Sequence, residues 1–412
     1  MALNTDTRQH SRVLVLSTWN PFPPTNGSRI RAYHLIRALA SKYDVTLLAF
    51  AGHANGEPFT EPRRDWPGLK IFPVMADPYR HVVRSRPIRY LSPIPLSYWR
   101  SSHMSAVVEE TMAKGSFELQ VALGIPAARH LRDYSTPTIV DVDTSLSFAL
   151  RERYQAATGS LRRLATWLSW AKAAWLERRI LRPVAACTVV ARHERPYLQR
   201  LVGNAVQVKV SPNGVDCYNY QPQFADKVPN RLIYNGALTY DVNFEAMRYF
   251  LAAVYPRIRR HEPDVELYIT GRTDGVTLSS LALDDSVHLT GFVDEIGDVV
   301  GRSTVAIAPI WEGGGTRIKI LEAMALGTPV VSTSKGAEGL MVEPEEEILL
   351  ADDADRFASQ TIRLLNNPEL RMRVAQRARR LVERHYDWRD VGEAFCQLIE
   401  QVAEQHSRPR LD

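Results

Sequence analysis

Short apolar segments that alternate with helical stretches constrain the fold of this chain more than any other feature. The runs VLVLS (13–17) and VTLLAF (45–50) flank a stretch over 29–43 whose apolar residues recur at helical spacing. Parallel strands need a crossover connection of this kind, so the order strand, helix, strand predicts a parallel sheet. The alternation restarts at RLIYNG (231–236) and continues through PVVST (329–333). The sequence therefore predicts an α/β fold with two doubly wound parallel-sheet halves.

A chain of 412 residues is long enough to form two domains, each with its own core. Between the two halves, residues 212–230 contain three prolines and little periodicity, which is typical of a linker. We expect an N-terminal domain over residues 1–211 and a C-terminal domain over 231–388. A last helix over 389–412 could pack back on the N-terminal domain.

The net charge of +5 leaves the class of partner open, because a basic surplus can meet nucleic acid, an anionic membrane or an anionic substrate. The sequence lacks the motifs of nucleic-acid-binding proteins, which argues against a nucleic-acid partner. The helical stretch over 146–182 is basic and carries Trp167, Trp170 and Trp175. Its broad apolar face fits packing within the protein, or contact with a membrane surface or a lipid-bearing acceptor.

The sequence also indicates the cellular compartment in which the protein is expected. Its start, MALNTDTRQHSR, lacks the apolar segment of a secretory signal, and no apolar run approaches the roughly 18–20 residues that span a bilayer. Three widely spaced cysteines, without a CxxC or Cys/His pair, fit a reducing compartment and predict no metal site. We expect a cytoplasmic protein, and contact at the inner membrane face stays open.

Two strand-to-helix junctions are weak candidates for ligand binding, since ligands of open parallel sheets bind at such junctions. Asn26, Gly27 and Ser28 stand just before the first helix, where free N–H groups attract anions, and Arg29 and Arg31 could add to that field. Gly236 follows a strand and Asn243 lies near the next helix, a pattern that an ordinary loop also explains.

The third junction, APIWEGGGTRIKILEAMALGTPVVST (308–333), carries the strongest signal. Three consecutive glycines and a threonine before a helix predict a cradle of backbone N–H groups for phosphate. Arg317 and Lys319 oppose the helix dipole at this position unless a polyanion lies there. Glu322 could accept two hydrogen bonds from a ribose diol. The absence of a Walker A lysine pattern and of GxGxxG argues against ATP hydrolysis and dinucleotide-dependent oxidation.

With GAEGL (336–340), this block resembles the donor-binding signature of the family-4 retaining glycosyltransferases of the GT-B fold. Supporting segments are NPFPPTNGSRIRAYHLIRALA, VDVDTS (140–145), PNGVD (212–216), NGALTYDVNFEAMRYF, TGFVDE (290–295) and HYDW (385–388). The nearest subgroup is that of bacterial sugar transferases for exopolysaccharide and cell-surface assembly. The resemblance implies two facing Rossmann-like domains with an interdomain cleft, and a role in polysaccharide biosynthesis.

The resemblance also implies roles for matching residues. Glu322 would hold the donor ribose, Val293 would lie beside the nucleobase, and Gly27 would close over the diphosphate. Four residues are candidates for catalysis. Asp141 and Asp143 would point into the cleft, and Arg317 and Lys319 would stabilise the charge of the diphosphate. Candidates for donor binding are Gly27, Ser28, Gly236, Arg272, Val293, Gly314, Gly315, Thr316 and Glu322.

The chain departs from the family pattern at two places. The first glutamate of the E-x7-E motif should stand where this chain has Gly314, and Glu312 is two residues too early to replace it. The loop ALGIP (122–126) lacks the histidine that many members carry nearby.

The expected reaction is transfer of a hexose-type sugar from a UDP- or GDP-sugar to an acceptor hydroxyl, with retained configuration and without a metal or cofactor. The acceptor could be a glycan, a lipid-linked molecule or a small molecule. Two alternatives stay open, a non-hydrolysing nucleotide-sugar epimerase and a non-catalytic subunit that binds a nucleotide-sugar.

Overall fold

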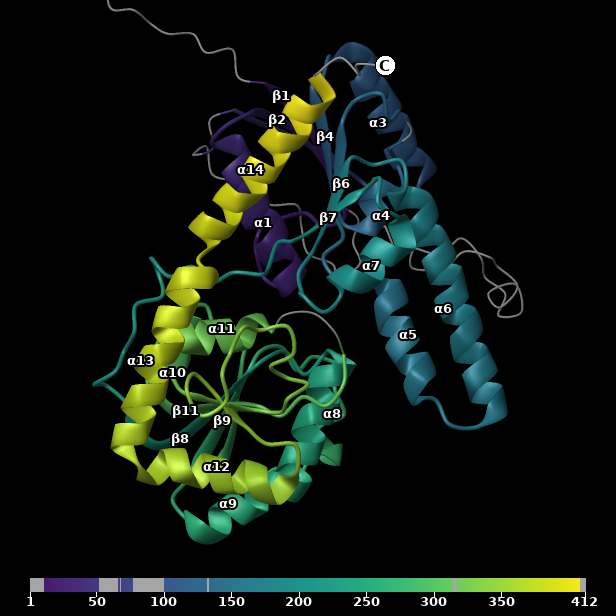
Figure 1. Cartoon of the computed structure of the whole chain (residues 1–412). Coiled ribbons are helices and arrows are strands. Elements are labelled where there is room, and N and C mark those ends of the chain that lie inside the picture. The colour runs from purple at the N-terminus through teal and green to yellow at the C-terminus, as the bar shows by residue number, and fades with distance from the viewer. Residues whose placement is uncertain are drawn as a thin grey trace, which may run out of the picture. The chain divides into compact units, whose positions relative to one another are not determined.

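The computed structural model describes residues 11–51, 66, 68–76, 100–131, 133–313 and 317–407. The chain divides into two compact units (Figure 1). The first contains Met1–Ser211 and Gly392–Asp412, and the second contains Pro212–Val391.

The first unit is built on a seven-stranded sheet in which every described strand pair is parallel. The strand order is β3-β2-β1-β4-β5-β6-β7, so the direction of winding reverses between β1 and β4. Such a switch point is where open sheets of this kind bind ligands. The strands are β1 (Arg12–Ser17), β2 (Asp44–Phe50), β3 (Leu69–Val74), β4 (Leu119–Leu123), β5 (Thr138–Asp141), β6 (Ala186–Val189) and β7 (Gln207–Val210).

Helices cover both faces of this sheet. Successive residues of a strand point to opposite faces, and accordingly Val13 and Val15 belong to one apolar core while Leu14 and Leu16 belong to another. The helices are α1 (Gly27–Ala40), α3 (Ser102–Lys114), α4 (Ile125–Ala128), α5 (Leu146–Ala156), α6 (Ser160–Leu181) and α7 (Arg195–Val202), together with α14 (Trp388–Ser407), which belongs to the first unit from Gly392 onward. Helix α14 contributes Phe395 and other apolar residues to the core that contains Val13 and the buried face of α1.

The helical stretch predicted over 146–182 consists of two helices, because the chain breaks at residues 157–159. Ala157 has an extended backbone, and Gly159 has a φ of 83°, in the left-handed region that favours glycine. The chain therefore reverses, and α5 packs alongside α6 as a helical hairpin (Figure 1).

The second unit contains a six-stranded sheet of order β10-β9-β8-β11-β12-β13, again with parallel pairs only among its described strands. Its strands are β8 (Val228–Asn235), β9 (Glu266–Thr270), β10 (Val287–Gly291), β11 (Ser303–Ala308), β12 (Val330–Ser332) and β13 (Leu349–Leu350). Its helices are α8 (Asp241–Tyr249), the π-helical turn η2 (Phe250–Val254), α9 (Tyr255–His261), the 3₁₀ turn η3 (Leu278–Ser280), α10 (Ile296–Gly301), α11 (Ile318–Ala325), α12 (Ala354–Asn366) and α13 (Pro368–His385).

The stretch 212–230, expected as a linker, contains the start of β8. The buried Arg379 of α13 donates hydrogen bonds to the carbonyl oxygens of Cys217, Tyr220 and Ala325, which ties the beginning of this stretch to the second unit.

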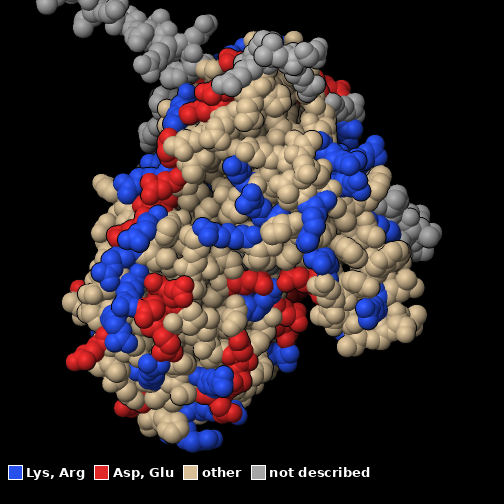
Figure 2. Space-filling model, viewed as in Figure 1, with Lys and Arg blue, Asp and Glu red and all other residues tan. Residues whose placement is uncertain are grey.

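The described helices include none that is both long and apolar enough to cross a bilayer. On the surface of the second unit, Lys and Arg side chains are interspersed with Asp and Glu where α12 and α13 lie (Figure 2).

The packing of α14 predicts a large loss of stability when Phe395, which is 1% exposed, is replaced by alanine. The variant Phe395→Ala leaves a cavity in the core shared with α1, and we expect it to lower the free energy of unfolding by about 3–5 kcal/mol. Urea unfolding measures this change. The exposed neighbour Gln397→Ala is the matched control, and equal stabilities of the two variants would contradict the packing of α14.

Candidate functional site

A pocket of about 260 Å³ lies at the carboxyl ends of the strands in the first unit. It collects residues from both sides of the switch point, among them Thr18 after β1, Gly124 after β4 and Asp143 after β5. Gly124 has a φ of 92°, and a Cβ there would stand 2.5 Å from the Thr18 Oγ1. A glycine is therefore required for the two strand ends to approach each other.

Asp141, at the end of β5, is committed to contacts within the protein. Its carboxylate accepts two hydrogen bonds from Arg31 of α1, at 2.8 Å from Nε and 2.6 Å from Nη2, and a third at 2.6 Å from the Thr188 hydroxyl. Both members of the ion pair are almost fully buried. Arg31 therefore does not add to an anion-binding field at the start of α1, contrary to the sequence expectation, because its charge is neutralised.

Asp143, two residues further on, has a different environment. Its backbone φ of 62° is rare for a residue with a side chain, and its half-buried carboxylate lines the pocket. The Ser28 hydroxyl lies 3.4 Å from its Oδ2. Burial raises the pKa of Asp143 to about 6, although the nearby Arg31 acts in the opposite direction. A carboxyl with this pKa can both accept and release a proton near neutral pH.

In the second unit, Lys319 of α11 connects two segments that the sequence left separate. Its Nζ donates to the Tyr234 hydroxyl at 2.8 Å and to the Asn243 Oδ1 at 3.0 Å, and it lies 4.0 Å from the centre of the Tyr234 ring. A Cβ at Gly236 would stand 2.5 Å from this Nζ, so the glycine makes room for the ammonium group. Burial, together with the Arg317 charge, lowers the pKa of Lys319 to about 7.

Arg317 immediately precedes α11, and its guanidinium has no carboxylate partner among the residues that the structure describes. Its Nη2 donates to the carbonyl oxygens of Glu312 and Gly313, at 3.2 and 2.8 Å, and in the described part of the chain its buried Nε has no hydrogen-bond partner. Burial lowers the pKa of Arg317. Within the described residues, neither Arg317 nor Lys319 forms an ion pair, although the nearby charges of Glu338 and Glu322 act on Arg317 and Lys319, respectively.

Glu322 lies one turn after Lys319 on the same helix. Its Oε2 accepts a hydrogen bond of 2.6 Å from the Asn235 amide, and that amide accepts one of 3.0 Å from the Thr270 hydroxyl. Both partners stand at strand ends, Asn235 in β8 and Thr270 in β9. Burial raises the pKa of Glu322 to about 7, against the Lys319 charge. One carboxylate oxygen is thus held in place by the sheet.

The structure brings together some of the residues singled out in the sequence and not others. Ser28, Asp141 and Asp143 share the pocket of the first unit, and Gly236 meets Lys319 in the second. Gly27 begins α1 beside them in sequence, and Val293 follows β10. The Arg272 guanidinium forms an exposed ion pair with Asp274. Gly314, Gly315 and Thr316 lie outside the described residues.

Sequence reasoning missed the aromatic and amide groups that position the cation and carboxylate of α11. Tyr234 and Asn235 are the last residues of β8, and a polar residue at the end of an otherwise apolar strand was the available signal. Their partners are 85 and 87 residues away, which no local pattern indicates.

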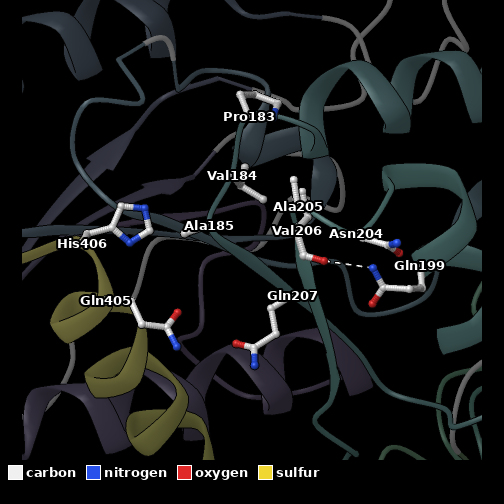
Figure 3. A pocket seen from close by; sticks show the side chains of 10 residues that line it. All are labelled: Pro183, Val184, Ala185, Gln199, Asn204, Ala205, Val206, Gln207, Gln405 and His406. Carbon is white, nitrogen blue, oxygen red and sulfur yellow. Dashed lines mark hydrogen bonds between the residues drawn. The ribbon is translucent and has the colours of Figure 1, made fainter. Parts of the chain in front are cut away.

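A larger hollow of about 760 Å³ lies in the first unit between the end of α14 and the starts of β6 and β7 (Figure 3). Its wall is mainly backbone and neutral side chains, including Gln199, Gln207 and Gln405. Parallel sheets bind ligands at the carboxyl ends of their strands, and this hollow is at the opposite edge. We therefore assign the site to the smaller pocket, despite its size.

Comparison with known proteins bears on both units. Residues 26–214 match the family model of the glycosyl transferase 4-like domain, and residues 229–367 match that of the glycosyl transferases group 1. A phosphatidyl-myo-inositol mannosyltransferase of Mycolicibacterium smegmatis is 31% identical over 220 residues, which cover 51% of this chain and 55% of that protein. The chain thus matches about half the length of this curated relative.

Solved structures resemble the chain over nearly its full length. Sucrose-phosphate synthase from Thermosynechococcus elongatus has a TM-score of 0.71 at 19% identity, and the match covers 95% of this chain and 99% of that one. Anabaena Alr3699/HepE, in complex with UDP and glucose, has a TM-score of 0.66 at 14% identity, with coverage of 95% and 100%. At these identities the likeness concerns the fold. With family models matched in both units, the chain belongs to the group 1 glycosyltransferases, and its two parallel-sheet units form the GT-B fold.

Proposed function

We propose that the protein transfers a hexose-type sugar from a UDP- or GDP-sugar to an acceptor hydroxyl, with retention of the anomeric configuration. The observation that carries the proposal is the pair of cations at the start of α11, Arg317 and Lys319, which lack a carboxylate partner within the described residues. Burying a cation without a counter-charge is costly, and a bound diphosphate would offset that cost.

In this proposal the second unit binds the donor. Arg317 and Lys319 lie against the diphosphate, on which negative charge increases as the bond between the sugar and the phosphate breaks. Glu322, held by Asn235, has a second oxygen available to accept hydrogen bonds from the ribose hydroxyls. The two side chains supply the positive charge, and we assign neither a metal ion nor a cofactor to the reaction.

The relatives support the donor class. The Mycolicibacterium smegmatis relative is a mannosyltransferase, and the HepE structure contains UDP and glucose. A hexose is common to these two names, and the HepE complex adds a nucleoside diphosphate. Retention of configuration rests on the resemblance to family-4 glycosyltransferases, as does a role in polysaccharide biosynthesis.

The first unit would bind the acceptor in the pocket that Asp143 lines. Retention in a single step requires that the acceptor oxygen approach the anomeric carbon from the face that the phosphate leaves. As this C–O bond forms and the bond between the sugar and the phosphate breaks, the hydroxyl proton passes to the Asp143 carboxylate. Asp141 does not take this role, because Arg31 and Thr188 occupy its oxygens. A glycan, a lipid-linked molecule or a small molecule would satisfy this chemistry, provided that it offers a hydroxyl group.

Removing both cations tests the donor half of the proposal. With UDP-glucose and GDP-mannose as donors and a pool of acceptors, the double variant Arg317→Ala, Lys319→Ala should release UDP or GDP at least about 100-fold more slowly, because preorganised donors to developing charge contribute that much or more. The exposed Arg302→Ala is the matched control. Unchanged turnover in the double variant would exclude the assigned diphosphate site.

Replacing Asp143 with asparagine tests the acceptor half. We expect Asp143→Asn to slow transfer by about 100-fold or more, as for loss of a general base, and to leave UDP binding in calorimetry unchanged. In the parent protein, transfer should decrease as the pH falls through about 6, because the Asp143 carboxylate then takes up a proton. The exposed Asp44→Asn in the same unit is the control. An unaltered rate and pH profile in Asp143→Asn would show that another group accepts the proton.

A further inference from the structure

The Lys319 amine lies among groups that suit its neutral form. Its Nζ donates to the Tyr234 hydroxyl at 2.8 Å and to the Asn243 Oδ1 at 3.0 Å, and both acceptors are uncharged. A neutral amine has two N–H groups and a lone pair, whereas a protonated amine has three N–H groups. The two acceptors therefore satisfy the neutral form, and they leave the third N–H of the charged form without a partner among the described residues.

The two acceptors are themselves held in place. The Tyr234 hydroxyl donates to the Asn243 Oδ1 at 2.8 Å, and the Asn243 amide donates to the Ala237 carbonyl oxygen at 2.8 Å. Tyr234 is fully buried in β8, and Asn243 belongs to α8. Neither side chain can therefore turn to serve a third N–H without breaking a hydrogen bond of its own.

The charged and aromatic groups around Lys319 act in both directions. Arg317, which immediately precedes α11, disfavours a second positive charge, and Glu322, one turn further along the helix, favours it. The Tyr234 ring, whose centre lies 4.0 Å from Nζ, also favours the charged form. Burial outweighs these attractions and, together with the Arg317 charge, lowers the pKa of Lys319 to about 7. Near neutral pH and without a donor, the amine is therefore present in both forms.

Arg317 differs from Lys319 because an arginine guanidinium stays charged in proteins. A diphosphate at the start of α11 would therefore meet one permanent cation and one amine whose charge depends on its surroundings. The phosphate oxygens supply both things that the charged amine lacks, which are a negative charge close by and an acceptor for a third N–H group.

We propose that the donor diphosphate and a proton bind together at this site, the proton passing from solvent to the lone pair of the Lys319 amine. The new N–H group then donates to a phosphate oxygen, and the amine becomes fully charged. This inference rests on the diphosphate site of the proposed function and adds to it a coupling between donor binding and pH.

Titration calorimetry of the full chain with UDP-glucose or GDP-mannose measures this proton. Both phosphates of these donors are esterified, so the donors themselves exchange no proton near neutral pH. Binding heats in buffers of different ionisation enthalpy give the number of protons taken up per donor. With the pKa of Lys319 at about 7, we expect about 0.8 proton at pH 7.5 and about 0.1 at pH 6, where the amine is already charged.

Glu322 requires a separate control, because burial raises the pKa of its carboxyl to about 7 as well. The variant Glu322→Gln should retain the uptake at pH 7.5, and Lys319→Met should abolish it. In Glu322→Gln the affinity for the donor should fall about fivefold or more between pH 7 and 8, because the amine that must be protonated is increasingly neutral. This measurement keeps Lys319 in place and decides the question if Lys319→Met binds too weakly for calorimetry. The exposed Arg302→Ala should change neither the uptake nor the affinity.

The outcomes separate this inference from the proposed function. A parent protein that binds a donor without taking up a proton would overturn the inference and leave the donor site in place, with Lys319 as a permanently charged or purely structural group. Uptake that persists in Lys319→Met would assign the proton to another group and would likewise overturn it. Absence of binding to either donor would overturn the diphosphate site, and the inference with it.

Discussion

Parallel strand pairing is the constraint on which both candidate sites depend. Because all described strands of each sheet run in the same direction, their carboxyl ends meet at one edge, and the residues that follow them are neighbours in space. In the first unit this edge gathers Thr18, Gly124 and Asp143 from three strands. In the second it gathers Asn235 and Thr270 beneath α11. The strands themselves are apolar because helices cover both of their faces, so polar chemistry is confined to these ends.

The two units differ in whether their cationic side chains are paired with a carboxylate. The first neutralises its buried cation within the fold, since Arg31 forms a two-point ion pair with Asp141. Such a pair orders α1 against β5 and leaves no net charge to attract a ligand. In the second unit the hydrogen-bond partners of Arg317 and Lys319 are carbonyl, hydroxyl and amide oxygens. These groups orient the cations without cancelling their charge. The second unit is therefore the one suited to a polyanion.

The sequence predicts the architecture well and the site only partly. Apolar runs such as 13–17 and 45–50 indicate buried strands because each run needs only local composition to be recognised. The break at Gly159 was missed, since helical periodicity continues on both sides of it and a glycine within a helical pattern is ambiguous. The pairing of Arg31 with Asp141 spans 110 residues. Contacts over this sequence distance depend on the order of strands in the sheet, which hydrophobic periodicity does not encode. Arg31 and Asp141 were therefore identified from the sequence, but their pairing was not.

The orientation of α6 in the first unit follows from a buried polar network on one of its sides. Glu177 accepts hydrogen bonds from the Ser145 and Ser147 hydroxyls and from the Ser147 amide, which lie at the start of α5. The Trp170 indole donates to the Tyr197 hydroxyl, which in turn donates to Ser147. Turning α6 so that its exposed side faced the first unit would withdraw the Glu177 carboxylate from its donors, and an unpaired buried carboxylate costs several kcal/mol. The polar network and the buried Ala173, Leu176 and Ile180 thus determine together which side of α6 faces the first unit.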